Sequence, residues 1–270
     1  MTSLSPHTTP QLQSAIRKVQ VAADHLYLAE EVPVAMVFDG TSAAVMMASA
    51  NDLQDFAMGF ALTEGFITSF DDIKEFELVS HDKGLEARFW LNPGQSQALT
   101  RRRRALAGPI GCGLCGIDSL DEAIRPLPQL ASKDAHFTQA QLVAATEKLR
   151  AHQPLHDITH AMHAAAFLGQ EGDIVAVRED VGRHNALDKL IGALAWANID
   201  PMQGAFVMTS RVSVELIQKT ALAGCPILVA VSAPTALAVD TARQAGVTLI
   251  AMARRGGGKI FSHPHLIRPT

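Results

Sequence analysis

Large apolar residues recur at alternate positions where the regular part of the chain begins. They occupy every second position from Val32 to Phe38, and a second apolar run extends from Ala43 to Ala48. A period of two is typical of a strand with one buried face. Because Asp39 and Gly40 between the two runs favour a tight turn, this stretch predicts a β-hairpin.

The pattern then changes to the period of a helix. Four apolar residues fall on one helical face, namely Leu53, Phe56, Ala57 and Phe60. Asn51 followed by Gln54 resembles a capping box, so a helix is predicted to run to about Thr63 and to close at Gly65. Residues 71–100 alternate loosely around a polar turn at 81–84, which predicts two further strands.

The second half of the chain alternates between strand-like and helix-like segments. Thr138 with Gln141 predicts a capped helix, and after Asp173 the alternation becomes regular. Strands are predicted at 174–177, 205–208, 227–231 and 248–252, and helices at 185–196, 212–223 and 235–244. This spacing indicates βαβ units. The predicted fold is therefore α/β, with three α/β/α layers around a mixed, largely parallel sheet and a smaller β-rich part at the N-terminus.

We divide the chain into three predicted parts. Residues 1–20 mix Ser, Thr, Pro, His and Gln and are predicted to be a disordered lead-in. Residues 21–130 form an N-terminal lobe that carries two of the three cysteines. Residues 131–270 form an α/β domain, which we expect to bind a cofactor. Pro126 and Pro128 mark a linker-like passage near the boundary.

Polar, glycine-rich or basic loops follow four successive predicted strands. They comprise residues 178–185, 209–211, 232–235 and 254–259. In sheets of this kind, ligands bind beyond the carboxyl ends of the strands. Four such loops at one edge are better explained by one shared anionic ligand than by four separate coincidences. The residues that we expect to serve this ligand include Arg183, His184, Asn185, Arg211 and Ser232.

Composition narrows the range of partners. The chain has 270 residues, of which 48% are hydrophobic and 19% are charged, and its formal net charge is −4 with a pI of about 6.2. Such a chain can bury a large core, and it has no overall field that would attract nucleic acid or an anionic membrane. The longest apolar run, near 221–233, is interrupted by Gly224 and Pro226, and the first residues lack a signal-peptide pattern. We therefore expect a cytoplasmic protein.

The candidate chemistry centres on Cys112 and Cys115, which lie in the sequence Gly-Cys-Gly-Leu-Cys-Gly at 111–116. Two thiols at this spacing can share a metal ion, close into a disulfide, or pass a sulfur atom. The surrounding glycines favour an exposed loop. Four arginines at 101–104 precede it, and they could gather phosphate, lower a thiol pKa or simply form a solvated surface.

Each of the three chemistries makes different demands. A deaminase-like zinc site would need a third ligand, such as His160, His163 or His184, and the chain lacks the His-x-Glu or Cys-x-Glu tripeptide that supplies the acid and base. A thioredoxin-type switch starts a helix, which the glycines disfavour. Sulfur transfer needs a reachable thiolate that carries a persulfide, and this loop suits it. Cys225 precedes Pro226 and is predicted to be a core residue.

Three motifs in this order resemble the FdhD family of formate dehydrogenase accessory sulfurtransferases. They are Glu-Asp-Val-Gly-Arg-His-Asn-Ala at 179–186 with Asp188-Lys189, Cys-Gly-Leu-Cys-Gly at 112–116, and Ser-Ala-Pro-Thr at 232–235. Segments 31–34, 52–60 and 163–166 extend the resemblance over most of the chain. The resemblance implies a cytidine-deaminase-like fold and a homodimer.

It also implies a function. Members of the family take sulfur from a cysteine desulfurase and transfer it to the molybdenum cofactor, Mo-bis(molybdopterin guanine dinucleotide), before the cofactor enters the formate dehydrogenase apoenzyme. By position, Cys112 would carry the persulfide and Cys115 would be its partner. The cofactor-binding segment would be Met252, Ala253, Arg254, Arg255, Gly256 and Gly257. A guanine nucleotide could mimic the cofactor. Two alternatives stay open: a zinc-dependent deaminase-like hydrolase, and a non-catalytic cofactor-binding chaperone.

Overall fold

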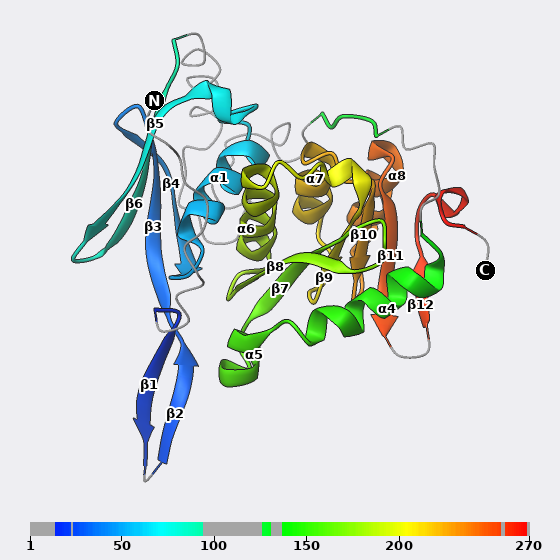
Figure 1. Ribbon diagram of the computed structural model, residues 1–270, viewed down its shortest axis with the longest axis horizontal. Helices are drawn as coiled ribbons and strands as arrows, with labels where there is room; N and C mark the ends of the chain where they lie inside the picture. Colours follow the sequence, from blue (N-terminus) through cyan, green and yellow to red (C-terminus); the bar gives the residue numbers. More distant parts are fainter. Residues whose placement is uncertain (1–13, 23, 94–125, 131–136, 255–256, 269–270) are drawn as a thin grey trace.

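The computed structural model describes residues 14–22, 24–93, 126–130, 137–254 and 257–268. Its largest element is a six-stranded mixed sheet in the order β12-β11-β10-β9-β7-β8 (Figure 1). The strands are β7 (His163–Leu168), β8 (Ile174–Asp180), β9 (Ala205–Met208), β10 (Ile227–Ala230), β11 (Thr248–Arg254) and β12 (Gly257–Ile260).

Strand direction places four carboxyl ends at one edge of this sheet. β9, β10 and β11 pair in parallel, whereas β7 runs antiparallel to both β9 and β8, and β12 runs antiparallel to β11. Two reversals restore the direction, so β8 points the same way as β9, β10 and β11. The predicted βαβ alternation is confirmed, and the loops after these four strands share an edge with the start of β7.

Helices cover both faces of the sheet, which confirms the three-layer α/β/α prediction. On one face lie α6 (Arg183–Trp196), α7 (Val214–Leu222) and α8 (Ala236–Ala245), packed over a buried apolar cluster. On the other face lies α4 (Gln139–Arg150), whose Leu142, Ala145 and Leu149 are fully buried. The Thr138–Gln141 capping box of α4 is present as predicted. A short helix, α5 (Pro154–Thr159), follows it.

A second, four-stranded sheet stands beside this body. Its strands are β3 (Glu31–Phe38), β4 (Thr41–Ser49), β5 (Ile73–His81) and β6 (Gly84–Leu91), in the order β4-β3-β6-β5, and α1 (Leu53–Thr63) packs against it. The predicted hairpin (β3 and β4) and the two further predicted strands (β5 and β6) are confirmed. Short 3₁₀ turns occur at Phe70–Asp72, Pro201–Gln203 and Pro264–Leu266. Of the helices in the described part of the chain, none combines the length and apolar character needed to cross a membrane.

The predicted capping box of α1 is wrong. Asp52 occupies the N-cap position in a left-handed conformation and makes no side-chain cap to the helix. The side chain of Asn51 is used elsewhere, because its Nδ2 donates to Asp52 Oδ2 (2.8 Å) and to the carbonyl oxygen of Glu179 (3.3 Å). A contact with a residue far along the chain therefore replaces the local cap.

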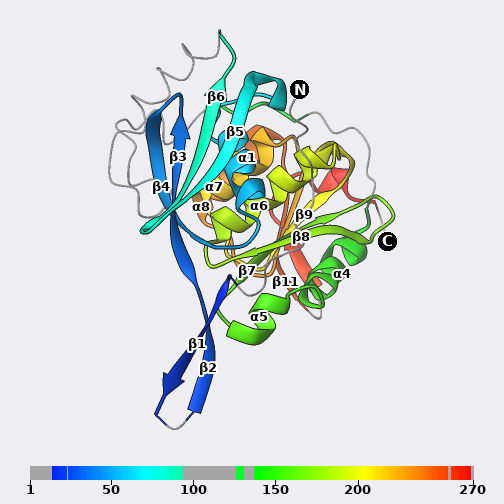
Figure 2. The same cartoon turned by 60° about the vertical axis from the view of Figure 1, so that its left-hand side comes forward.

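A two-stranded arm projects from the body (Figure 2). It consists of β1 (Ile16–Val21) and β2 (Asp24–Ala29), paired antiparallel. The prediction of a disordered segment at 1–20 is therefore wrong for residues 16–20, while residues 1–13 lie outside the described residues. Sequence periodicity missed β1 because it has no core face of its own: pairing with β2 satisfies its backbone groups. Val21, Leu26, Tyr27 and Leu28 on this arm are exposed.

The two parts of the molecule meet where α1 crosses α6 at very close range. A Cβ added to Gly59 on α1 would lie 1.8 Å from the carbonyl oxygen of Asp188, and one added to Gly192 on α6 would lie 2.0 Å from that of Asp55. Both obstacles are helix backbone, which cannot yield as a flexible side chain can. The helices reach this distance only because both crossing positions are glycine.

We therefore expect Gly59→Ala to be strongly destabilising. The methyl group must force the two helices apart, so the free energy of unfolding should fall by about 3 kcal/mol or more, measured by urea denaturation. Gly224→Ala is the control, because its added Cβ meets nothing within 4 Å and pays only for a positive φ of 78°. That control should lose about 1 kcal/mol. Equal losses in the two variants would contradict the close approach.

Candidate functional site

A cavity of about 570 Å³ opens at the carboxyl edge of the large sheet, on the side covered by α4 and α5. Its lining comes from the ends of β9 and β11, the loops after β10 and α5, the start of β7, and the two helices. The lining residues are Thr146, Glu147, Arg150, Gln153, His156, His160, Ala161, Met162, His163, Thr209, Val231, Ala253 and Arg254. The position is the one expected of a ligand site in a sheet of this type.

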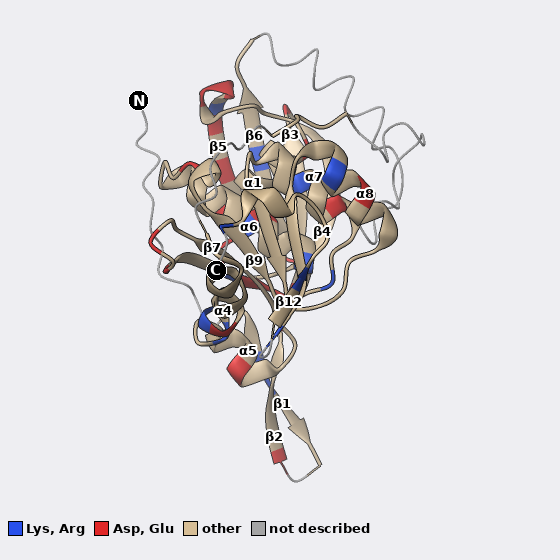
Figure 3. Cartoon of the chain, turned by 90° about the vertical axis from the view of Figure 1, so that its right-hand side faces the viewer, with Lys and Arg blue, Asp and Glu red and all other residues tan. Residues whose placement is uncertain are grey.

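The cavity has a largely apolar surface and carries two arginine side chains, one from α4 and one from the end of β11. Arg150 lies on α4 and forms an ion pair with Asp157, while Arg254 ends β11 and donates from Nε to the carbonyl oxygen of Val231 (3.3 Å). On α4, acidic Glu147 is followed by basic Lys148 and Arg150, and Figure 3 shows both acidic and basic positions on this helix. The lining therefore offers a ligand both charged side chains and apolar surface.

His163 lines this cavity and is affected by charges from the loops after β8 and β9. Burial lowers the pKa of its imidazole, and the positive charges of Arg183 and, more weakly, Arg211 lower it further. Arg183 follows β8 and Arg211 follows β9, so basic groups from both loops act on the residue that begins β7. The sequence prediction that these strand-end loops converge is consistent with this arrangement.

The predicted cofactor-binding segment lies partly in this cavity. Ala253 and Arg254 line it. Met252 is exposed at a positive φ of 56°, and its N–H donates to the carbonyl oxygen of Ser232 (3.0 Å). Gly257 begins β12 at a φ of 135°. Arg255 and Gly256 lie outside the described residues, as do Cys112, Cys115 and the four arginines at 101–104.

The three predicted site residues at the start of α6 differ in their surroundings. Arg183 is half-buried, and its Nε has no hydrogen-bond partner within the described residues. His184 Nε2 lies 3.3 Å from Ser213 Oγ and 3.8 Å from a carboxylate oxygen of Glu215. Burial, together with the charges of Arg183 and Lys219, lowers the pKa of His184 to about 4, so the imidazole is neutral at pH 7.

Asn185 serves the structure of the protein. It is buried, and its Nδ2 donates to the carbonyl oxygen of Met47 (2.8 Å) and to Asp180 Oδ1 (3.0 Å). Arg211 is exposed and Ser232 is half-buried beside Met252. The conspicuous run at 179–185 thus contains residues of two kinds: Arg183 faces the strand-end loops, and Asn185 holds β4 to β8.

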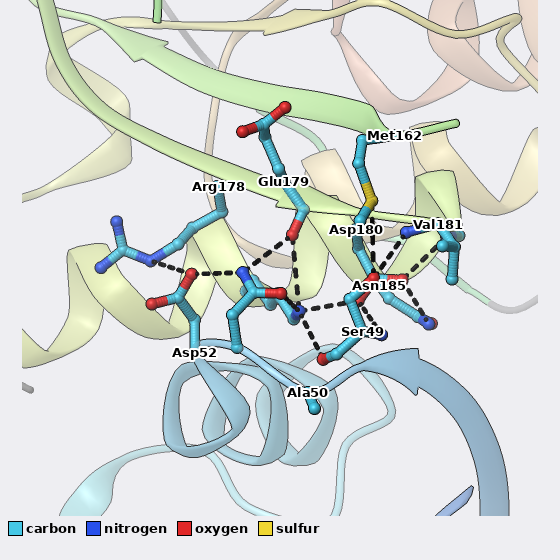
Figure 4. A network of polar contacts seen from close by, with 12 residues as sticks. Ser49, Ala50, Asp52, Met162, Arg178, Glu179, Asp180, Val181 and Asn185 are labelled. Atoms are coloured by element: carbon cyan, nitrogen blue, oxygen red, sulfur yellow. Dashed lines mark hydrogen bonds and ion pairs between the residues drawn. The ribbon is translucent and has the colours of Figure 1, made fainter. Parts of the chain in front are cut away.

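Asp180 in this run belongs to a buried ion pair and lies within a network of polar contacts (Figure 4). Lys189 Nζ is 2.7 Å from Asp180 Oδ2, and both side chains are completely buried. The same lysine donates to the carbonyl oxygen of Ser49 (3.1 Å), and Asp180 accepts from the Ser49 N–H (2.9 Å) and the Gly182 N–H (2.7 Å). Each charge is therefore surrounded by complementary groups, as burial of an ion pair requires.

A second buried pair connects α6 to α7 and α1. Lys219 Nζ is 2.9 Å from both carboxylate oxygens of Asp188 and also contacts Thr63 Oγ1 (2.8 Å) and Glu64 Oε1 (3.1 Å). Burial raises the pKa of Asp188, and Lys219 opposes this rise. Asp188 and Lys189, adjacent in sequence, thus each contribute one charge to a different pair.

Sequence reasoning missed the wall of the cavity formed by α4 and α5. Gln153 and His156 gave no recognisable motif. His160 was considered only as a zinc ligand, and His163 as a zinc ligand and as part of the family resemblance at 163–166. Among the residues whose positions are described, no group of three or more His, Cys, Asp or Glu is arranged to hold a metal ion. The close spacing of His156, His160 and His163 was the sequence signal that could have indicated this wall.

Cys225 is a core residue, as predicted. It is fully buried, its Sγ donates to the carbonyl oxygen of Ile227 (3.3 Å), and burial raises the pKa of its thiol to about 12. A thiol that is protonated and inaccessible at neutral pH is a poor nucleophile.

The fold and the site together define a three-layer α/β protein with an arginine-bearing cavity at the carboxyl edge of its sheet. The chain matches the FdhD/NarQ family over residues 29–268, and it belongs to that family. The sulfur carrier protein FdhD of Agrobacterium fabrum is 47% identical over 250 residues, which span 93% of this chain and 92% of that protein.

Further comparisons agree. The sulfur carrier protein FdhD of Bordetella bronchiseptica is 47% identical over 249 residues, covering 92% of this chain and 90% of that protein. The crystal structure of a formate dehydrogenase accessory protein from Desulfotalea psychrophila has a TM-score of 0.66 at 21% identity, covering 94% of this chain and 97% of that one. This structural similarity supports the mixed α/β fold.

We expect His184 to make stability depend on pH. Its pKa is about 4 in the folded chain and near 6.5 when unfolded, so between these values the unfolded chain binds more protons. The contribution of the neutral His184 imidazole to the free energy of unfolding is therefore complete above about pH 6.5. It is lost as the pH falls toward 4, by ~3 kcal/mol in all. Urea denaturation between pH 4.5 and 7.5 should show a smaller loss for His184→Gln than for the wild type. An NMR titration of the His184 imidazole with a midpoint near 6.5 would contradict this expectation.

Proposed function

We propose that this protein is a sulfur carrier that serves the maturation of formate dehydrogenase. It receives sulfur from a cysteine desulfurase as a persulfide on Cys112 and passes it to Mo-bis(molybdopterin guanine dinucleotide), before that cofactor enters the apoenzyme. The support comes from membership of the FdhD/NarQ family, the names of relatives at 47% identity, and the Cys112–Cys115 pair. We place this activity in the cytoplasm, with a homodimer as the working unit.

The proposed loading step transfers one sulfur atom. The Cys112 thiolate attacks the outer sulfur of the desulfurase persulfide, a new S–S bond forms, and the desulfurase cysteine leaves as a thiolate. For release, the Cys115 thiolate attacks Cys112 Sγ. A Cys112–Cys115 disulfide forms, and the outer sulfur leaves as hydrosulfide, with both electrons of the broken bond. A reductant of the dithiol class then restores the two thiols.

The cavity at the strand edge is where we place the acceptor, which is a substrate of the protein. The observation that carries this assignment is the presence of Arg150 and Arg254 in the lining of a cavity of about 570 Å³ that also contains part of the predicted cofactor-binding segment. Guanidinium groups suit the diphosphates of a guanine dinucleotide. Arg183, whose buried Nε lacks a partner within the described residues, offers a further donor near His163.

Loading tests the first half of the proposal. After incubation with a cysteine desulfurase and cysteine, mass spectrometry should find 32 Da of added sulfur on Cys112, a mass that follows from the proposed persulfide. Cys112→Ala should abolish it. Cys225→Ala is the matched control, because it removes a thiol whose raised pKa and burial keep it unreactive, and its loading should equal that of the wild type. Unchanged persulfide labelling in Cys112→Ala would reject the assignment.

Binding tests the second half. GDP, as a probe for the guanine dinucleotide, should bind the wild type, and Arg254→Ala should raise its Kd about 10- to 100-fold through loss of a charge-assisted hydrogen bond. Isothermal titration calorimetry measures both. Arg243→Ala is the control, since Arg243 lies in the last turn of α8, pairs with Asp240 and is not part of the cavity lining. A Kd unaffected by Arg254→Ala would place the nucleotide elsewhere.

A further inference from the structure

β8 ends in two carboxylates that serve opposite faces of the large sheet. Successive side chains of a strand point to opposite faces. Asp180 turns toward α6 and the buried Lys189, whereas the Glu179 carboxylate points the other way, toward α5 (Figure 4). Glu179 is buried, with 5% of its surface exposed, so its carboxylate needs partners inside the protein.

Glu179 supplies the N-terminal cap that α5 does not have. The residue at the N-cap position, Gln153, makes no side-chain hydrogen bond to the helix. The Leu155 N–H donates to Glu179 Oε2 and the His156 N–H donates to Oε1, each at 2.9 Å. One carboxylate therefore satisfies two of the backbone donors that every helix leaves free in its first turn.

Such a cap matters more for α5 than for a longer helix. It has six residues, from Pro154 to Thr159, which is too short to be stable by itself. Apolar packing of Leu155 against Ala15 and Met162 keeps the helix against the body. That packing is non-directional, whereas two hydrogen bonds to a buried carboxylate fix the direction of the helix axis.

The direction of α5 determines where the lining residues on one wall of the cavity lie. His156 and His160 line the cavity from α5 and its C-cap, and Gln153, Ala161, Met162 and His163 line it on either side. His156 Nδ1 donates to the carbonyl oxygen of Met162 (3.0 Å), so the helix and the segment after it are tied together. Glu179 itself is not part of the lining.

We propose that Glu179 is a positioning residue for the ligand of this cavity: by capping α5, it holds the histidine-bearing wall in the orientation that binds the acceptor. This inference rests on the proposed function, because it takes the cavity as the acceptor site. Glu179 acts through α5, without touching the ligand.

The test compares Glu179→Gln and Glu179→Ala with the wild type. Gln retains one acceptor oxygen, so GDP affinity should fall about tenfold in Glu179→Gln and further in Glu179→Ala. Hydrogen exchange of the peptide at 154–160 should rise in the same order, while thermal melting of Glu179→Gln shows a folded protein. Glu171→Gln, at an exposed position in the turn after β7, is the matched control and should change neither quantity.

A double-mutant cycle with His160→Ala separates positioning from a general loss of stability. If Glu179 acts by orienting the wall, its substitution should cost less affinity once His160 has been removed. Additive losses of GDP affinity, or a Glu179→Gln protein that binds GDP as tightly as the wild type, would overturn the positioning role alone. A wild-type protein that loads sulfur on Cys112 but does not bind GDP would overturn the cavity assignment, and this inference with it.

Discussion

The buried ion pair between Asp180 and Lys189 is the interaction on which the rest of the architecture depends. Two full charges without contact with water would be very unfavourable if either lacked partners. Their further partners are Ser49 at the end of β4, Asn51 just after it, the Glu179 carbonyl oxygen on β8, Gly182 after β8 and Asn185 on α6. The four-stranded sheet cannot move away from the six-stranded one without leaving these charges unsatisfied.

The other contacts between the two parts depend on the same geometry. Gly59 and Gly192 allow α1 and α6 to touch backbone to backbone, and Lys219 joins Asp188 on α6 to Thr63 at the end of α1. The glycine contact leaves no room for a side chain between the two helices, and the two buried ion pairs join the same parts of the molecule. Packing and electrostatics therefore select the same single arrangement.

The sequence was sufficient for the parts of the fold that depend on local pattern. The strands and helices after Asp173 follow from periodicity, and the sharing of one edge by their loops follows from strand direction. Ala253 and Arg254 were identified through the family motif and do line the cavity. The motif at 179–185 was predicted to serve a ligand, but Asn185 in it serves the structure. The sequence alone does not distinguish a polar residue that binds a ligand from one that joins two layers. The partners of Asp180 and Asn185 lie about 130 residues away, at Ser49 and Met47. The α5 wall was missed for a related reason: six residues are too few for a helical period, and the cap comes from a strand.

The opposite orientations of Glu179 and Asp180 restrict how β8 can change in evolution. A shift of one residue relative to β7 would exchange the two faces, sending the cap of α5 into the layer of α6 and the partner of Lys189 into the cavity wall. A single-residue insertion or deletion within this strand would thus break two distant contacts at once, whereas a change of two residues would preserve the side of each carboxylate. A change of length in the turn at 169–173, which lies outside the paired residues, would leave each carboxylate on its own side of the sheet.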